Sequence, residues 1–337
     1  MTPSPSFHTI YWPAFLLALS LPLPHRILTH AHWTLGRAKM SKSTGNVVNP
    51  FFALNRFGVD PLRFYLAHDG GISHDADYGN EQVVERYRKG LQGGLGNLAS
   101  RVLRGKRWSV PRAVERFKKG ELGVPPSPPA ESPADDGDAA AAAAVEVESE
   151  TLASTNVETE AEAAAPTTTT TTSTNTCAPS INPWSPSEAA LWSLLHHTTT
   201  RVTTRYLASD ASSACKKILS QIYSTNAFLQ AAAPWTSPHL THTPVASTPF
   251  DNAVSDLVSV DRTIYLCAES LRLVGIMLLP VMPEKMGRLL DMLGVKESRR
   301  TWEWVVPGRD LEYGKAKDGI GMGKGVEGVL FPPLEDP

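Results

Sequence analysis

The order of polar and apolar positions predicts a strand followed by short helices near the start of the chain. Residues 26–33 alternate between apolar and polar side chains, so we expect a half-exposed strand there. A loop rich in Gly, Lys and Ser follows. Asn49–Pro50 and Asp60–Pro61 each place a capping side chain before a proline at the first helical position, and Gly58 can end the first helix. This order of elements is typical of an α/β unit.

The apolar spacing changes to that of a helix from residue 81 to residue 108. Six apolar positions lie three or four residues apart and predict one amphipathic helix: Val84, Tyr87, Leu91, Leu95, Leu98 and Val102. The glycines at positions 90, 93, 94 and 96 each cost up to about 1 kcal/mol of helix propensity. We therefore expect a neighbour packed closely enough to compensate.

The second half of the chain predicts an all-helical bundle. Residues 185–188 (Ser-Pro-Ser-Glu) form a capping box with proline at the first helical position. The next helix carries Ala214, Ile218, Ile222 and Leu229 along one face and ends at Pro234. Two more are expected, over 252–279 and over 283–293 before Gly294. From residue 301 the chain is glycine-rich, and we expect an irregular tail packed back by its aromatic residues.

Composition separates these parts. Residues 119–180 are rich in Pro, Ala, Glu and Thr and carry almost no large apolar side chains, so we expect a disordered insertion. The expected organisation is an α/β part over 1–78, a first helical part over 79–118, the insertion, the remaining bundle over 181–300 and the tail over 301–337.

The net charge of −2 provides no overall basic field for a polyanionic partner, so any contact with RNA must be local. The three cysteines form no Cys-x-x-Cys pair, which argues against a disulfide framework and a zinc knuckle. The apolar run over 10–21 resembles part of a secretory signal, but it is too short to span a bilayer and no basic residue precedes it.

The most informative residues lie in the loop after the predicted strand. Lys39-Met40-Ser41-Lys42-Ser43 places two lysines three residues apart among hydroxyls, followed by Thr44 and Gly45. A mobile cationic loop of this kind can wrap a triphosphate, with hydroxyl and backbone N–H groups making the shorter contacts. The alternative is a solvated turn, because lysines near serines are common.

This five-residue string is the second signature of class I aminoacyl-tRNA synthetases. The stretch from Phe7 to Tyr78 resembles methionyl-tRNA synthetases on both sides of it, most of all the mitochondrial type. The resemblance implies part of a Rossmann-like catalytic domain followed by an α-helical anticodon-binding bundle. It also implies ATP-dependent activation of methionine, with ATP accompanied by Mg²⁺, and transfer to methionine tRNA.

The resemblance implies roles for individual residues. Lys39 and Lys42 would be the catalytic lysines that neutralise charge on the departing pyrophosphate, and Met40, Ser41 and Ser43 would complete the ATP-binding loop. His8 and Trp12 match positions that line the methionine pocket; without the family they would be an ordinary histidine and a core anchor.

His30 and His32 face the same side of the predicted strand. A metal site would need a third ligand, and the sequence nominates none, so no structural zinc is expected. We expect the two histidines to line the ATP site or to be satisfied by hydrogen bonds.

Asn97 and Arg101 lie four residues apart on one helix face, where the ordinary interpretation is a polar helix edge. Residues 97–101 (Asn-Leu-Ala-Ser-Arg) match the family segment that meets the anticodon, and Trp235 matches the tryptophan on which a base stacks. An unpaired base stacked on an aromatic side chain contributes roughly 1–3 kcal/mol.

The first family signature, His-x-Gly-His, does not occur in the sequence. We therefore expect a C-terminal part of the enzyme that lacks the first half of the catalytic domain and forms negligible adenylate alone. The alternatives are a non-catalytic tRNA-binding module and another class I synthetase, for leucine or cysteine. The resemblance implies a monomer without a membrane partner in the mitochondrial matrix, or otherwise in the cytoplasm.

Overall fold

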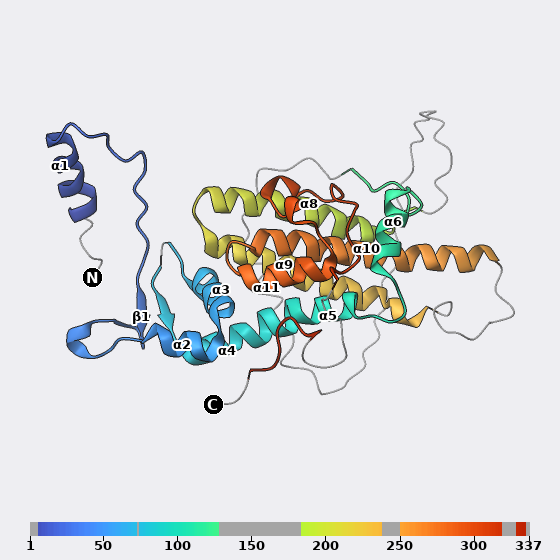
Figure 1. The fold of residues 1–337 in the computed structure, drawn as a ribbon, viewed down its shortest axis with the longest axis horizontal. Coiled ribbons are helices and arrows are strands. Elements are labelled where there is room, and N and C mark those ends of the chain that lie inside the picture. The colour runs from blue at the N-terminus through green and yellow to red at the C-terminus, as the bar shows by residue number, and fades with distance from the viewer. Residues whose placement is uncertain (1–5, 73, 128–182, 238–249, 319–327, 335–337) are drawn as a thin grey trace, which may run out of the picture.

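The computed structural model describes residues 6–72, 74–127, 183–237, 250–318 and 328–334. Within these ranges a helical bundle lies beside a small sheet, and an N-terminal helix stands apart from both (Figure 1). The expected disordered insertion falls mostly outside the described residues. Its first part does not: residues 119–127 are described and Leu122 is fully buried, so the packed chain continues past the boundary expected at residue 119.

Three short strands among the described residues form a sheet in the order β2-β1-β3. They are β1 (Trp33–Leu35), β2 (Ala38–Lys39) and β3 (Ala76–Tyr78). β1 pairs antiparallel with β2 and parallel with β3, and helices α2 (Pro50–Phe57) and α3 (Val59–Asp69) connect β2 to β3. The expected α/β connectivity is therefore present in a small form.

The strand expected over 26–33 was wrong in all but its last residue, Trp33. The backbone N–H of Ala31 donates to the carbonyl oxygen of Ile72, and the N–H of His32 donates to the carboxylate of Asp75. Loop carbonyls and side chains therefore replace the regular ladder that a strand requires.

The N-terminal caps predicted for α2 and α8 are present in the structure. The Asn49 side chain accepts from the N–H of Phe51, and Gly58 ends α2 with a positive φ of 80°. The capping box over 185–188 begins α8 (Pro186–Leu207) as expected. Asp60 does not cap its own helix: its carboxylate accepts from the N–H of Lys285 instead, at the start of another helix.

One long helical stretch crosses the molecule below the bundle (Figure 1). It consists of α4 (Asn80–Arg86), the π-helix η3 (Tyr87–Gly96) and α5 (Asn97–Leu103), so it ends before residue 108 and its middle has the wider π geometry. Three of its glycines pack closely, as expected: a Cβ would lie 3.4 Å from Leu219 at Gly90, 3.3 Å from Tyr223 at Gly94 and 3.4 Å from Phe331 at Gly96.

The bundle packs the long helical stretch against the other helices. Its remaining elements are α6 (Val110–Lys118), α9 (Ala211–Ala232), η4 (Pro234–Thr236), α10 (Phe250–Leu278) and α11 (Pro283–Leu293), with the short turns η6 (Glu297–Arg299) and η7 (Trp302–Trp304). α10 is central, because its described residues from Val260 to Leu278 are all buried. The helices expected over 252–279 and 283–293 are confirmed.

The described residues form two buried apolar clusters. The larger one fills the bundle, and the smaller one lies beneath the sheet and contains Phe57, Tyr65 and Tyr78. α3 joins them, since Phe64 belongs to the larger cluster and the next residue, Tyr65, to the smaller. The sheet and the bundle are therefore built on one shared helix.

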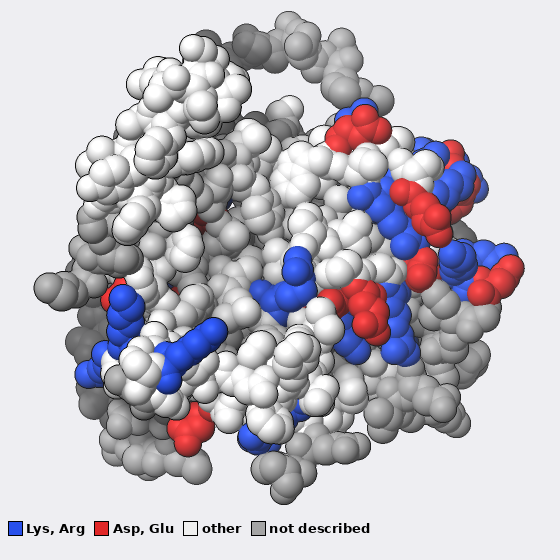
Figure 2. Space-filling view, turned by 60° about the vertical axis from the view of Figure 1, so that its left-hand side comes forward, with Lys and Arg blue, Asp and Glu red and all other residues white. Residues whose placement is uncertain are grey.

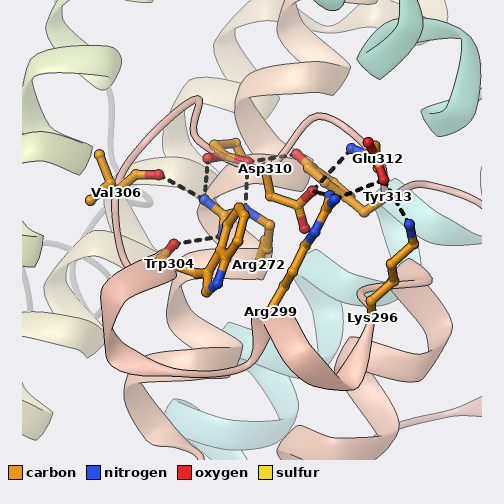
Figure 3. A network of polar contacts seen from close by, with 9 residues as sticks. Arg272, Lys296, Arg299, Trp304, Val306, Asp310, Glu312 and Tyr313 are labelled. Carbon is orange, nitrogen blue, oxygen red and sulfur yellow. Dashed lines mark hydrogen bonds and ion pairs between the residues drawn. The ribbon is translucent and has the colours of Figure 1, made fainter.

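Over the described residues 301–318 the tail is irregular apart from the short turn η7, and buried charged groups as well as apolar packing hold it in place (Figure 3). Arg272 of α10 makes two hydrogen bonds to Glu269 and two to the carbonyl oxygens of Trp304 and Val306. Tyr313 donates to Glu269 at 2.7 Å. Because the two buried charges pair with each other and also bond to Trp304, Val306 and Tyr313, they hold this described part of the tail against α10.

No helix among the described residues is long and apolar enough to cross a membrane.

Candidate functional site

The loop that carries the two lysines begins with a tight hairpin. β1 and β2 are joined by Gly36 and Arg37, which both have positive φ, 59° and 61°. Two successive left-handed residues give the turn that matches the twist of a hairpin. Arg37 is not a glycine, so this conformation needs support, and its N–H donates to the carboxylate of Asp77 at 2.8 Å.

Asp77 ties the hairpin to the neighbouring strand. Its carboxylate also accepts from the Thr34 hydroxyl at 2.6 Å, so one side chain of β3 holds both β1 and the turn. The hydrogen bonds from Thr34 and from the Arg37 backbone lower the pKa of Asp77 below its ordinary value. The carboxylate therefore stays ionised and keeps the hairpin in place at neutral pH.

The ends of the loop are joined by backbone pairing, whereas its two lysine side chains are exposed. Ser41 bridges to Asn46, Lys42–Thr44 form the 3₁₀ turn η2, and Gly45 leaves it with a φ of 68°. Met40 packs against the small core, and the hydroxyls of Ser41 and Ser43 lie 2.7 Å apart. Lys39 and Lys42 are exposed, and neither makes an ion pair with a described residue. This arrangement can receive an anion.

The two histidines lie against a different feature. A cavity of about 250 Å³ is bounded by residues 28 and 30–33, by the end of α3 and the loop after it, and by the start of α9. His30 and His32 line it, but no residue of the loop over 39–43 does. The His30 Nδ1 lies 2.7 Å from the Ala31 carbonyl oxygen. No group of three possible metal ligands occurs among the residues that the structure describes.

The residues matched to a methionine pocket stand apart from the loop. His8 lies in η1 (Phe7–Tyr11) and Trp12 begins α1 (Trp12–Ala18), and neither element buries any residue. Trp12 is 46% exposed and Phe15 is 65% exposed. Figure 1 shows α1 at the end of an extended segment, away from the hairpin. The structure does not bring these two residues to the lysines.

Arg101 and Trp235, by contrast, are brought together from distant parts of the chain. The Arg101 guanidinium carbon lies 4.8 Å from the centre of the Trp235 ring. Its Nη2 donates to the Oε1 of Gln230 at 2.8 Å, and Arg107 donates to the carbonyl oxygen of Trp235 at 2.5 Å. Asn97 is exposed one helical turn before Arg101. A half-buried aromatic ring with a guanidinium group beside it can stack a base and read its edge.

The distribution of charge on the surface agrees with the expectation that any contact with RNA is local. Among the described residues on the face drawn in Figure 2, Lys and Arg side chains stand apart or beside Asp and Glu and form no continuous basic patch. Any binding of a polyanion to this face must therefore depend on particular side chains.

Comparison with known proteins places the chain in a family. Residues 4–103 match the family described as tRNA synthetases class I (M). A probable mitochondrial methionine–tRNA ligase of Neurospora crassa is 38% identical over 330 residues, which is 98% of this chain and 42% of the relative. The mitochondrial methionine–tRNA ligase of Homo sapiens is 30% identical, over 98% of this chain and 45% of that protein.

The chain belongs to the class I methionyl-tRNA synthetase family. It spans about half the length of the curated relatives it matches. The fold agrees: Mycobacterium tuberculosis methionyl-tRNA synthetase, solved in complex with methionyl-adenylate, superimposes with a TM-score of 0.62 at 24% identity, over 97% of this chain and 48% of that one. A synthetase of the methionyl family, rather than one for leucine or cysteine, is the identity that these comparisons support.

Sequence reasoning nominated the lysine loop and, separately, Arg101 and Trp235, but it did not identify the residues that hold them. Asp77 and Gln230 belong to no motif, and each reaches its partner only through the fold. A signal for Asp77 would have required knowing that β3 pairs with β1. Gln230 could have been found only from the register of α9 against α5.

Proposed function

We propose that this chain supplies the lysine loop and the anticodon-binding bundle of a methionine–tRNA ligase. The enzyme activates methionine with ATP and transfers it to methionine tRNA, and the named relatives support this assignment. The observation that carries the proposal is the exposed pair Lys39 and Lys42 on a hairpin held by Asp77. Such a loop can close on a triphosphate while its base stays fixed.

The chemistry needs no covalent intermediate with the protein. The methionine carboxylate attacks the α-phosphate, the bond to the β-phosphate oxygen breaks, and pyrophosphate leaves with the negative charge. Lys39 and Lys42 neutralise that charge as it develops, and Ser41 and Ser43 offer hydroxyl donors. ATP enters as its Mg²⁺ complex, so the metal is part of the substrate.

The proposal is tested in a chimera. This chain replaces the matching segment of the N. crassa relative, and methionine-dependent exchange of pyrophosphate into ATP is measured. We expect the chimera to catalyse exchange and the isolated chain to show negligible exchange. A chimera that folds, binds ATP and methionine, and yet shows no exchange would contradict the assignment.

A second candidate function is a tRNA-binding module that acts without catalysis, and the contact of Arg101 with Trp235 favours it. The isolated chain is titrated with methionine tRNA, and Trp235→Ala is compared with wild type. Loss of about 1–3 kcal/mol of binding free energy in the variant supports base stacking. Binding without any exchange activity in the chimera would favour the module over the ligase.

The relatives named as mitochondrial also support a mitochondrial location for this protein.

A further inference from the structure

The base-stacking position on Trp235 is already occupied in the free protein. The Arg101 guanidinium lies 4.8 Å from the ring centre, which is the distance at which a cation rests on an aromatic face. The indole is half-buried, because it also packs against the core of the bundle. A base that stacks directly on the face under Arg101 must therefore take the place of the guanidinium.

Gln230 holds Arg101 in this position. It lies in the last turns of α9, is exposed, and accepts a hydrogen bond of 2.8 Å from Arg101. Arg107 holds the backbone of Trp235, because it donates a hydrogen bond to the Trp235 carbonyl oxygen. The guanidinium is thus oriented by α9, while the ring is positioned independently of it.

We propose that Arg101 is a removable cap on Trp235, and that Gln230 is the positioning residue that keeps the cap closed until a base displaces it. This inference rests on the proposed role of Trp235 in binding an RNA base. The guanidinium is planar and fits the same face that a base needs, so the two compete.

Displacement also gives Arg101 a second use. A guanidinium has five N–H donors and no acceptor, and in the capped state one of them is bound to Gln230. Once released, those donors can reach the edge or the phosphate of the base that replaced it. Opening the cap therefore converts a contact within the protein into a contact with RNA.

The test follows Trp235 directly. The full chain is labelled with 5-fluorotryptophan, and the Trp235 fluorine resonance among the eight tryptophans is assigned by its loss in Trp235→Phe. Gln230→Met removes the acceptor without changing charge or length much. Gln92→Met makes the same change on the helical stretch that carries Arg101 and serves as the control. The RNA probe is a stem-loop with the methionine anticodon in its loop.

We expect Gln230→Met to shift the Trp235 resonance without RNA and to tighten RNA binding about two- to fivefold, because the base no longer competes with a held cation. Gln92→Met should change neither. An unchanged resonance in Gln230→Met overturns the cap. Weaker RNA binding in Gln230→Met also overturns it, since the held guanidinium would then belong to the bound state.

A failure of the proposed base stacking on Trp235 can be distinguished from a failure of the cap alone. If Trp235→Ala binds the stem-loop as tightly as wild type, Trp235 does not stack a base and the displacement is overturned with it. If Trp235→Ala loses binding and Gln230→Met leaves affinity and resonance unchanged, the RNA site stands and only the cap is wrong.

Discussion

At the scale of single residues, Asp60 shows how a side chain can serve an element far away in the chain. It lies in the first turn of α3 and is 3% exposed, and its carboxylate accepts from the N–H of Lys285 at 2.6 Å. No side chain at the N-cap position of α11 makes this bond. A carboxylate there satisfies a free N–H and favours the positive end of the helix dipole.

We expect Asp60→Ala to lower the free energy of unfolding by about 1–2 kcal/mol. Asp60→Asn should keep most of it, because an amide oxygen can still accept the bond. Urea denaturation of the three chains measures the difference. Equal stability of Asp60→Ala and wild type would show that the contact contributes nothing.

His68 and Asp69 give the fold a dependence on pH. Burial lowers the pKa of His68 below its ordinary value. Burial alone would raise the pKa of Asp69, but hydrogen bonds from His68 and Arg86 outweigh it and lower the pKa. The folded protein therefore binds fewer protons than the unfolded chain at mildly acidic pH, and stability falls as pH drops.

For His68 the loss begins below the unfolded histidine pKa of about 6.5 and continues to its lowered folded pKa. His196, whose pKa is also lowered by burial, adds to the same slope. We expect His68→Gln to show a shallower loss of unfolding free energy than wild type between neutral and mildly acidic pH. Identical slopes in urea titrations across this range would refute a role for His68.

The residue scale also shows where prediction from sequence ends. Lys39 and Lys42 could be nominated as site residues because their motif is a continuous stretch of sequence. Asp77, Gln230 and the true partner of Asp60 could not be found, because each acts on a residue that only the tertiary structure brings near.

At the scale of elements, Arg262 of α10 makes hydrogen bonds to both chain segments that flank residues 128–182. Its Nε donates to the Leu122 carbonyl oxygen at 2.9 Å, and its Nη1 donates to that of Pro183 at 3.2 Å and to the Glu188 carboxylate at 2.8 Å. Both flanking segments are therefore anchored on one buried guanidinium. The three partners of Arg262 all lie among the described residues next to the bundle.

Replacing residues 128–182 by a short Gly/Ser linker should leave the melting temperature nearly unchanged, because the anchors on both sides remain. Arg262→Met should instead cost about 3–5 kcal/mol, since it leaves buried Glu188 without its charged partner. Differential scanning calorimetry compares the two. A large fall in melting temperature on deletion would mean that the replaced residues contribute to the fold.

Helices were predictable where their signals are local. The capping box of α8, the Asn49 cap and the Gly294 end all operate within a few residues. The structure of residues 26–32 was not predictable in this way. Alternating apolar and polar positions suggested a strand, but they cannot show whether a neighbouring strand is present to pair with it. The π geometry of η3 gave no sign in the apolar spacing either.

At the scale of the whole molecule, α3 joins the lysine hairpin to the bundle. Tyr65 donates to the carbonyl oxygen of Asp77 beneath the sheet. On the bundle side, Arg63 donates to the carbonyl oxygens of Pro280 and Val281, and the His68 carbonyl accepts from Ser212 of α9. The sequence predicted a mixed part and a helical part, but not this joint, whose contacts span two thirds of the chain in sequence.

The central claim is that the hairpin lysines act on the departing pyrophosphate, and Lys42→Ala in the chimera tests it most directly. Lys89→Ala is the control, because Lys89 is exposed and pairs with Glu85 one helical turn earlier. We expect Lys42→Ala to lower the rate of methionine-dependent pyrophosphate exchange by about a hundredfold or more, with methionine affinity nearly unchanged. An unaltered exchange rate in Lys42→Ala would contradict the account.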